Sequence, residues 1–130
     1  MSFTHTVQVN HDRGNISVNA RLEHSGGGEL NIDETVPTPS TDMLVAATVD
    51  VSQIVSAMIM ADQDITLYTN DLGTGAPDDT FVLAANNPLV WNNASPTANP
   101  FSADITALYV TNASGTETTL KALFLTDPTV

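Results

Sequence analysis

The sequence predicts an all-β fold: an antiparallel β-sandwich, jelly-roll-like, with about eight strands and no long helix. Short runs of alternating apolar and polar residues recur along the chain, the period of a strand that buries one face. Turns rich in Gly, Pro and Asn separate the runs at spacings near the roughly 8–12 residues typical of sandwiches and barrels. No segment carries the apolar repeat of a long helix.

Residues 1–24 are expected to form a β-hairpin, because apolar and polar residues alternate on both sides of a turn at residues 10–15. A triple glycine at residues 26–28 then breaks the pattern, and residues 29–32 are expected to form one short edge strand. The two prolines in residues 35–41 predict an extended surface segment.

The middle of the chain is expected to continue with a buried strand over residues 43–51. Residues 52–62 fit both a helical stripe and two strand faces; we favour a strand, a turn and a strand, with a helical turn at residues 50–53. The pattern of residues 57–67 recurs weakly in residues 107–120, and each copy is expected to be a hairpin. Other strands are predicted at residues 80–84, 89–91 and 120–126, with a long loop over residues 92–102.

We expect one domain over residues 1–130, because 130 residues are the usual length of a compact domain. Its charge is uneven. Residues 1–28 hold two acids and two arginines, whereas 13 of the 15 acids lie between Arg21 and Lys121, where no basic residue occurs. An ordinary solvated acidic face, which keeps the protein soluble, explains this distribution. The sharper hypothesis is a neutral N-terminal arm, residues 1–28, that docks on a partner or a neighbouring subunit and leaves an acidic body facing outward.

The composition excludes several classes of function. A net charge of −12 with three basic residues argues against binding nucleic acid or anionic membrane. The absence of cysteine removes disulfides, thiolate catalysis and cysteine-based zinc sites. The N-terminal residues lack the layout of a signal peptide, and the longest apolar stretch, residues 54–61, is too short to span a bilayer. We therefore expect synthesis in a cytoplasm.

No catalytic residue and no cofactor are predicted. Asp71, Asp78 and Asp79 form a weak calcium candidate, but the ordinary chemistry of turns explains the same residues. The histidines at positions 5, 11 and 24 could meet across the first hairpin as metal ligands, or could serve as core or interface residues. The acids of residues 29–34 more readily protect a strand edge than form a glycosidase pair.

Aromatic and apolar residues at exposed positions are the natural anchors of an interface. The only tryptophan, Trp91, lies beside two asparagines, which also suits stacking on a sugar, although an anchor in the core or at an interface is favoured. The expected interface residues are Phe3, Val7, Val9, Trp91 and Phe101.

The C-terminal segment, from ADITALYVTN at residues 103–112 to LFLTD at residues 123–127, resembles that of virion structural proteins of tailed bacteriophages. Within that group it is similar to small jelly-roll decoration, or cement, proteins. The resemblance covers mainly residues 43–130 and is one of style and strand pattern. It implies a non-enzymatic protein on the capsid surface, made in the host cytoplasm, with itself and the major capsid protein as partners and a homotrimer as its assembly.

Two alternatives remain at this point. A carbohydrate-binding or other β-sandwich module of a phage tail, fibre or cell-surface protein would expose Trp91 for a ligand. A small jelly-roll enzyme such as a cupin would need a histidine-rich metal cluster on inner strands, but all three histidines lie within the first 24 residues.

Overall fold

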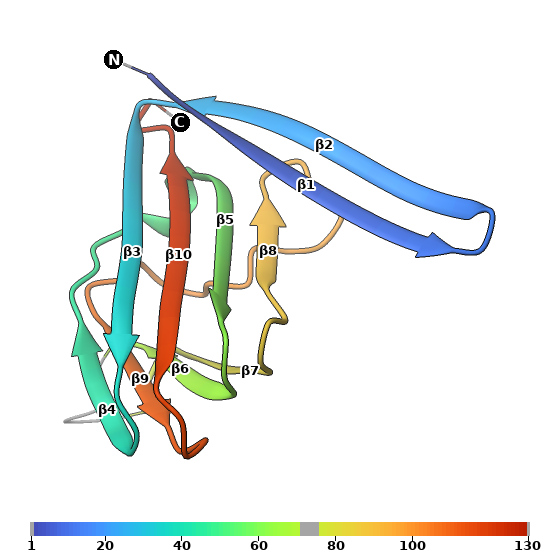
Figure 1. Ribbon diagram of the computed structural model, residues 1–130. Helices are drawn as coiled ribbons and strands as arrows, with labels where there is room; N and C mark the ends of the chain where they lie inside the picture. Colours follow the sequence, from blue (N-terminus) through green and yellow to red (C-terminus); the bar gives the residue numbers. More distant parts are fainter. Residues whose placement is uncertain (1, 71–75, 130) are drawn as a thin grey trace.

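The computed structural model describes residues 2–70 and 76–129, and this part of the chain is all-β (Figure 1). A single 3₁₀ turn, η1 (Val51–Gln53), is the helical structure of the described residues, and Asp50 caps it. The strands, in chain order, are β1 (Phe3–Arg13), β2 (Ile16–Gly26), β3 (Gly28–Val36), β4 (Ser40–Val45), β5 (Ile54–Ala61), β6 (Ile65–Thr69), β7 (Asp79–Leu83), β8 (Leu89–Asn92), β9 (Leu108–Asn112) and β10 (Thr118–Thr126).

Eight of these strands form two packed antiparallel sheets, in the orders β3-β10-β5-β8 and β4-β9-β6-β7. The pairing has a simple rule: the first of the eight strands pairs with the last, the second with the second-last, and so on inward to β6 and β7. A long antiparallel hairpin rolled into two sheets gives this order, which is that of a jelly roll. The predicted antiparallel sandwich is confirmed, and its eight strands are β3 to β10.

The core lies between the two sheets. In β10 the side chains of Leu120, Ala122 and Phe124 point inward and are buried, whereas Lys121 and Leu123 point outward. Phe124 also lies near Phe101, with ring centroids 5.8 Å apart. Burial of each large apolar side chain contributes about 1.5–3 kcal/mol, so the alternation seen in the sequence accounts for much of the stability of the sandwich.

The two internal hairpins predicted at residues 57–67 and 107–120 are wrong. The strands exist, but β5 pairs with β10 and β8, while β6 pairs with β9 and β7. Each predicted turn instead carries the chain from one sheet to the other. Asn112, fully buried at the second crossing, donates hydrogen bonds to the carbonyl oxygens of Val36 and Thr116 and so holds this crossing to the end of β3.

Several element boundaries also differ from those predicted. The buried strand expected over residues 43–51 ends at Val45. Beyond it, a single antiparallel β-bridge joins Val49 to Ile105. The edge strand expected over residues 29–32 extends over all of β3, because β10 offers nine consecutive partners. The helical turn expected at residues 50–53 is present as η1.

Strands β1 and β2 form a separate two-stranded sheet, hereafter the arm. They pair with each other without a break, from Phe3 opposite Gly26 to Arg13 opposite Ile16. The turn is two residues long, shorter than predicted, and Gly14 takes the left-handed conformation (φ 58°) that glycine adopts without strain. Figure 1 shows the arm leaving the top of the sandwich and extending well beyond it.

Glycines make the junction between the arm and the sandwich. A Cβ atom at Gly26 would overlap the carbonyl oxygen of Thr126, and one at Gly28 would overlap the Thr126 hydroxyl. Only glycine therefore lets the chain pass this close to the end of β10. A Cβ at Gly27 would meet only the ring of Pro128, at 3.3 Å.

Replacing Gly26 by alanine is expected to lower the free energy of unfolding by about 1–3 kcal/mol, because backbone must move to admit the methyl group. Gly27→Ala is the matched control, with a smaller loss, because a proline ring can shift more easily than a carbonyl. Urea denaturation of both variants measures the difference. Equal losses would show that the close approach at Gly26 does not limit the fold.

Candidate functional site

The arm has one apolar and one polar face. Cross-strand partners in a two-stranded ribbon project to the same side, so the register assigns every residue to a face. One face, the arm strip, is defined by Val9, His11, Ile16, Val18, Ala20 and Leu22. The opposite face carries Gln8, Asn10, Asp12, Ser17, Asn19 and Arg21. This separation is typical of a sheet that packs against something on one side only.

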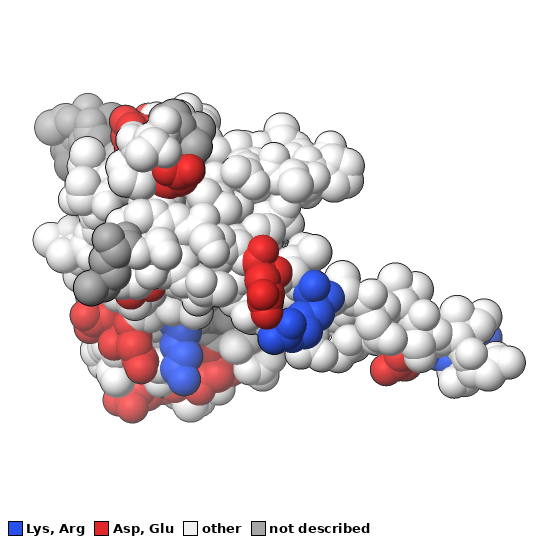
Figure 2. Space-filling view, turned by 90° about the horizontal axis from the view of Figure 1, so that it is seen from above, with Lys and Arg blue, Asp and Glu red and all other residues white. Residues whose placement is uncertain are grey.

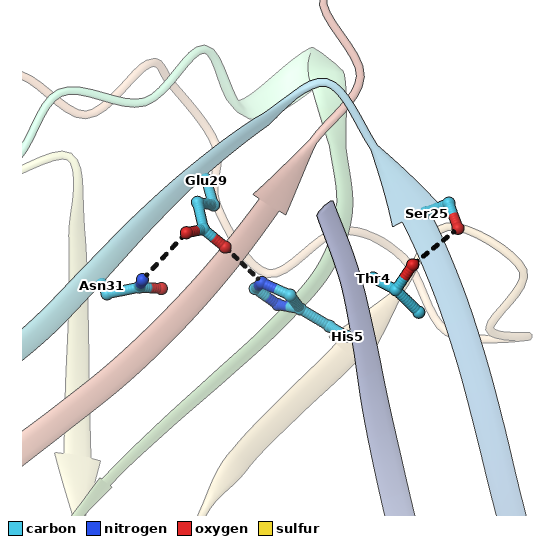
Figure 3. A network of polar contacts seen from close by, with 5 residues as sticks. All are labelled: Thr4, His5, Ser25, Glu29 and Asn31. Carbon is cyan, nitrogen blue, oxygen red and sulfur yellow. Dashed lines mark hydrogen bonds and ion pairs between the residues drawn. The ribbon is translucent and has the colours of Figure 1, made fainter. Parts of the chain in front are cut away.

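The base of the arm is fixed to its own sandwich (Figure 3). His5 Nε2 lies 2.8 Å from Glu29 Oε2, and Asn31 donates a hydrogen bond of 3.2 Å to the other oxygen of the same carboxylate. Across the polar side of the arm, the hydroxyls of Thr4 and Ser25 lie 3.3 Å apart. The contact of His5 with Glu29 ties β1 to the first residues of β3, and that of Thr4 with Ser25 joins β1 to β2.

Beyond its base the arm is exposed to solvent. Every residue from 8 to 21 is exposed, and the arm strip presents Val9 at 52% and Val18 at 67% exposure. A two-stranded sheet alone in water is at best marginally stable, and contiguous exposed apolar surface marks a site of association. The arm strip is therefore the first candidate functional surface.

A second exposed apolar surface lies on the outer face of the sheet β3-β10-β5-β8. Met58, Met60 and Leu123 line a shallow hollow of about 180 Å³ there, together with the stem of Lys121. Leu123 is 51% exposed. A neighbouring hollow of about 410 Å³ adds the carboxylates of Asp33 and Asp62. We call this surface, defined by Met58, Met60, Lys121 and Leu123, the sheet groove.

The sheet groove begins where the arm base ends. His5 and Val7 of the arm share a small hollow with Ser56, Met58 and Leu123 of the sheet. The proximal part of the apolar arm face thus already covers one end of this sheet face. The sequence placed Met58 and Met60 on one side of a strand but carried no signal for which side faces outward, so the sheet groove was not predicted.

Charge separates the arm from the body. Two of the three basic residues, Arg13 and Arg21, lie on the arm, and the arm as a whole is neutral. In Figure 2 most acidic side chains lie on the body, whereas the extended arm carries both basic and acidic side chains. Arg21 pairs with Glu23 at 2.8 Å in full exposure, a contact that contributes little to stability.

The structure places the predicted interface residues in different environments. Phe3 and Val7 are half-buried at the arm base, and Val9 is exposed on the arm strip. Trp91 is half-buried on β8, and its indole N–H donates to the carbonyl of Thr97 at 3.0 Å. The expectation that Phe101 is exposed is wrong.

Phe101 is 4% exposed and belongs to the core. Its ring packs edge-on against Phe81, with centroids 5.4 Å apart, and also lies beside Phe124. Because Asn99 accepts a hydrogen bond from the Phe101 amide, the loop turns inward at this point and buries the ring. The composition of the loop gave no sign of this turn.

The weak calcium candidate is only partly described, because Asp71 lies outside the described residues. The carboxylate of Asp78 accepts a hydrogen bond of 2.7 Å from the Asn70 side chain. That of Asp79 accepts one of 2.9 Å from the Ser102 amide. In the described residues both acids thus accept hydrogen bonds from neighbouring segments of the chain.

The three histidines do not gather. His5 and His24 are cross-strand partners at the arm base, but His11 lies opposite Val18 near the tip. Within residues 2–70 and 76–129, no group of three or more potential ligands is placed to hold a metal ion. The same residues include no helix long and apolar enough to cross a membrane.

No protein-family model, curated protein or solved structure matches this chain. Its function must therefore be inferred from its own residues, and the two uncovered apolar surfaces are the features that most need explanation.

The link between His5 and Glu29 predicts a local effect on the arm. Glu29→Ala is expected to speed amide hydrogen exchange in residues 3–7 by about two- to fivefold, the effect of losing one solvent-exposed charged contact. Glu34→Ala, on the same strand, is the matched control and should leave exchange in the arm unchanged. Equal protection in both variants would mean that other contacts hold the arm base.

Asp62 predicts a pH dependence of stability. Hydrogen bonds from the Thr118 hydroxyl and the Thr119 amide, with a smaller effect of the Lys121 charge, lower the pKa of this carboxyl. The folded pKa lies below the unfolded value of about 3.9, so the stabilisation is present above that pH and is lost as pH falls through the folded pKa.

The melting temperatures of wild type and Asp62→Asn should therefore differ most near neutral pH and converge below about pH 4. Thr118→Val, which keeps the shape but removes the hydroxyl, should reproduce part of this change. A difference that is the same at every pH would contradict the assignment.

Proposed function

We propose that this chain is a non-enzymatic structural protein of a virus particle, a decoration or cement protein that stabilises the exterior of the head. The observation that carries the proposal is the arm: a neutral β-ribbon with an uncovered apolar face, projecting from a compact acidic jelly roll. The apolar surface of such an arm is covered only when the protein assembles with a partner. A protein of a virus particle functions in such an assembly.

The charge distribution supports an external position. The body, residues 29–130, holds 13 acids and one basic residue, Lys121, so it does not attract packaged nucleic acid. Its acidic surface is suited to face solvent, while the neutral arm is suited to contact the major capsid protein and neighbouring copies. The jelly-roll order agrees with this role, because that architecture occurs among viral capsid proteins, although lectins and cupins share it.

The main rival is a carbohydrate-binding module of a phage tail, fibre or cell-surface protein. It requires an aromatic ring open to a sugar. Trp91 is half-buried, packs against the core and has its N–H engaged by Thr97, which leaves less of the ring for stacking. The residues of the arm strip, in contrast, are exposed to solvent. The particle role is therefore the better supported of the two.

The test is cosedimentation of the purified protein with virus particles, from the source of this sequence, that have been stripped of their surface proteins. We expect saturable binding in a fixed ratio to the major capsid protein, and a rise in the temperature at which the heads disrupt. Deletion of residues 2–26 should abolish binding. Binding to a glycan array with no binding to particles would instead establish the rival.

A further inference from the structure

We propose that the arm strip of one copy of this chain docks in the sheet groove of a second copy. The inference concerns how copies of the chain contact each other in solution and needs no virus particle, so it goes beyond the proposed function. It rests on three observations about the described residues: two matching uncovered surfaces, the direction of the arm, and the placement of charge.

The two surfaces match in chemistry and are both left open. The arm strip presents Val9, Ile16, Val18 and Leu22 to solvent. The sheet groove presents Leu123 opposite Met58, with Met60 next to it on β5, and the unbranched methionine side chains adapt to an incoming surface. One face of the arm carries about half of the residues of its two eleven-residue strands, fewer than the roughly 20–30 residues on each side of a standard interface, so a single arm-to-groove contact is small.

The direction of the arm selects a second copy as the occupant. The proximal part, at His5 and Val7, already reaches the near end of the groove of its own chain. The ribbon then continues in unbroken register to Arg13 and projects away from the body in both views (Figures 1 and 2). Without a bulge or kink it does not fold back, so the rest of its own groove stays open to the arm of a neighbour.

Charge favours contact through the arm over contact between bodies. Two bodies that each carry the whole net charge of −12 repel each other, whereas the neutral arm approaches an acidic body without this penalty. At its tip Arg13 lies on the side of the arm strip, opposite Ile16. The groove is bordered by Asp33 and Asp62, which outnumber its one cation, Lys121, so a docked tip brings Arg13 toward a net negative edge.

The contact joins two different surfaces, an arm and a groove, and is therefore heterologous. Such contacts cover both the arm and the groove of every copy when they close into a ring or are exchanged within a pair. A ring of three agrees with the homotrimer expected from the resemblance to decoration proteins. The arm-to-groove contact itself is the same in either arrangement.

Sedimentation velocity of the full chain over a wide concentration range tests the inference. The wild type is expected to self-associate. Val18→Asp and Leu123→Asp each place a charge in one of the two surfaces and should weaken association at least about tenfold. The matched controls are Asn19→Asp on the polar face of the same strand and Val82→Asp on the exposed face of β7; both should associate as the wild type does.

Mixing the two defective variants identifies the surfaces that meet. Leu123→Asp keeps an intact arm strip and Val18→Asp an intact sheet groove, so the mixture should form a heterodimer that neither variant forms alone. Both positions are exposed, and circular dichroism checks that each variant is folded. A monomeric wild type at about 100 μM, or a mixture that stays monomeric, would overturn the inference.

These outcomes are independent of the particle assay. A wild type that is monomeric in solution yet binds particles would overturn arm exchange and retain the decoration role. A wild type that self-associates through the two surfaces but does not bind particles would support arm exchange and overturn the decoration role.

Discussion

The fold depends on the pairing of β10 with its two neighbours. This strand joins β3 on one side and β5 on the other, so it closes the roll that begins at the start of the sandwich. Its inner side chains, Leu120 to Phe124, fill the core, and its outer side chains form the middle of the sheet groove. At its end Thr126 leaves space only for glycine in the segment that leads to the arm.

One strand thus connects the core, the groove and the attachment of the arm. A change in the register of β10 would turn Lys121 and Leu123 inward and expose Leu120, because side chains alternate between the faces of a strand. The position of the groove relative to the arm base is consequently fixed by the same hydrogen bonds that close the sandwich. A surface built in this way is stiff, which lowers the entropy lost when a partner binds.

The sequence predicts the strands well because alternation is local. Each residue of a run such as 3–9 or 120–124 reports the face it occupies, and Gly or Asn marks where the run ends. Which strands pair is not local information. The segments at residues 57–67 and 107–120 look like hairpins, yet their strands belong to different sheets, since a short polar turn serves a hairpin and a crossing equally well. The burial of Phe101 and the exposure of the sheet groove were not predicted for the same reason. Whether a side chain is buried depends on which segments, distant in the sequence, pack over it.

The topology also sets the order in which the parts of this protein can form during synthesis. The arm is a local hairpin whose partners lie close in sequence, so it can fold soon after residue 26 leaves the ribosome. The roll closes only when β10 reaches β3, across some ninety residues, and such distant pairing is slow. During that interval the nascent chain carries an apolar ribbon that is at best marginally stable alone, with no body to support it. The sheet groove forms only with β10, so the exposed apolar residues of a nascent arm have no groove to dock in before then, and a high concentration of nascent chains would favour aggregation over assembly.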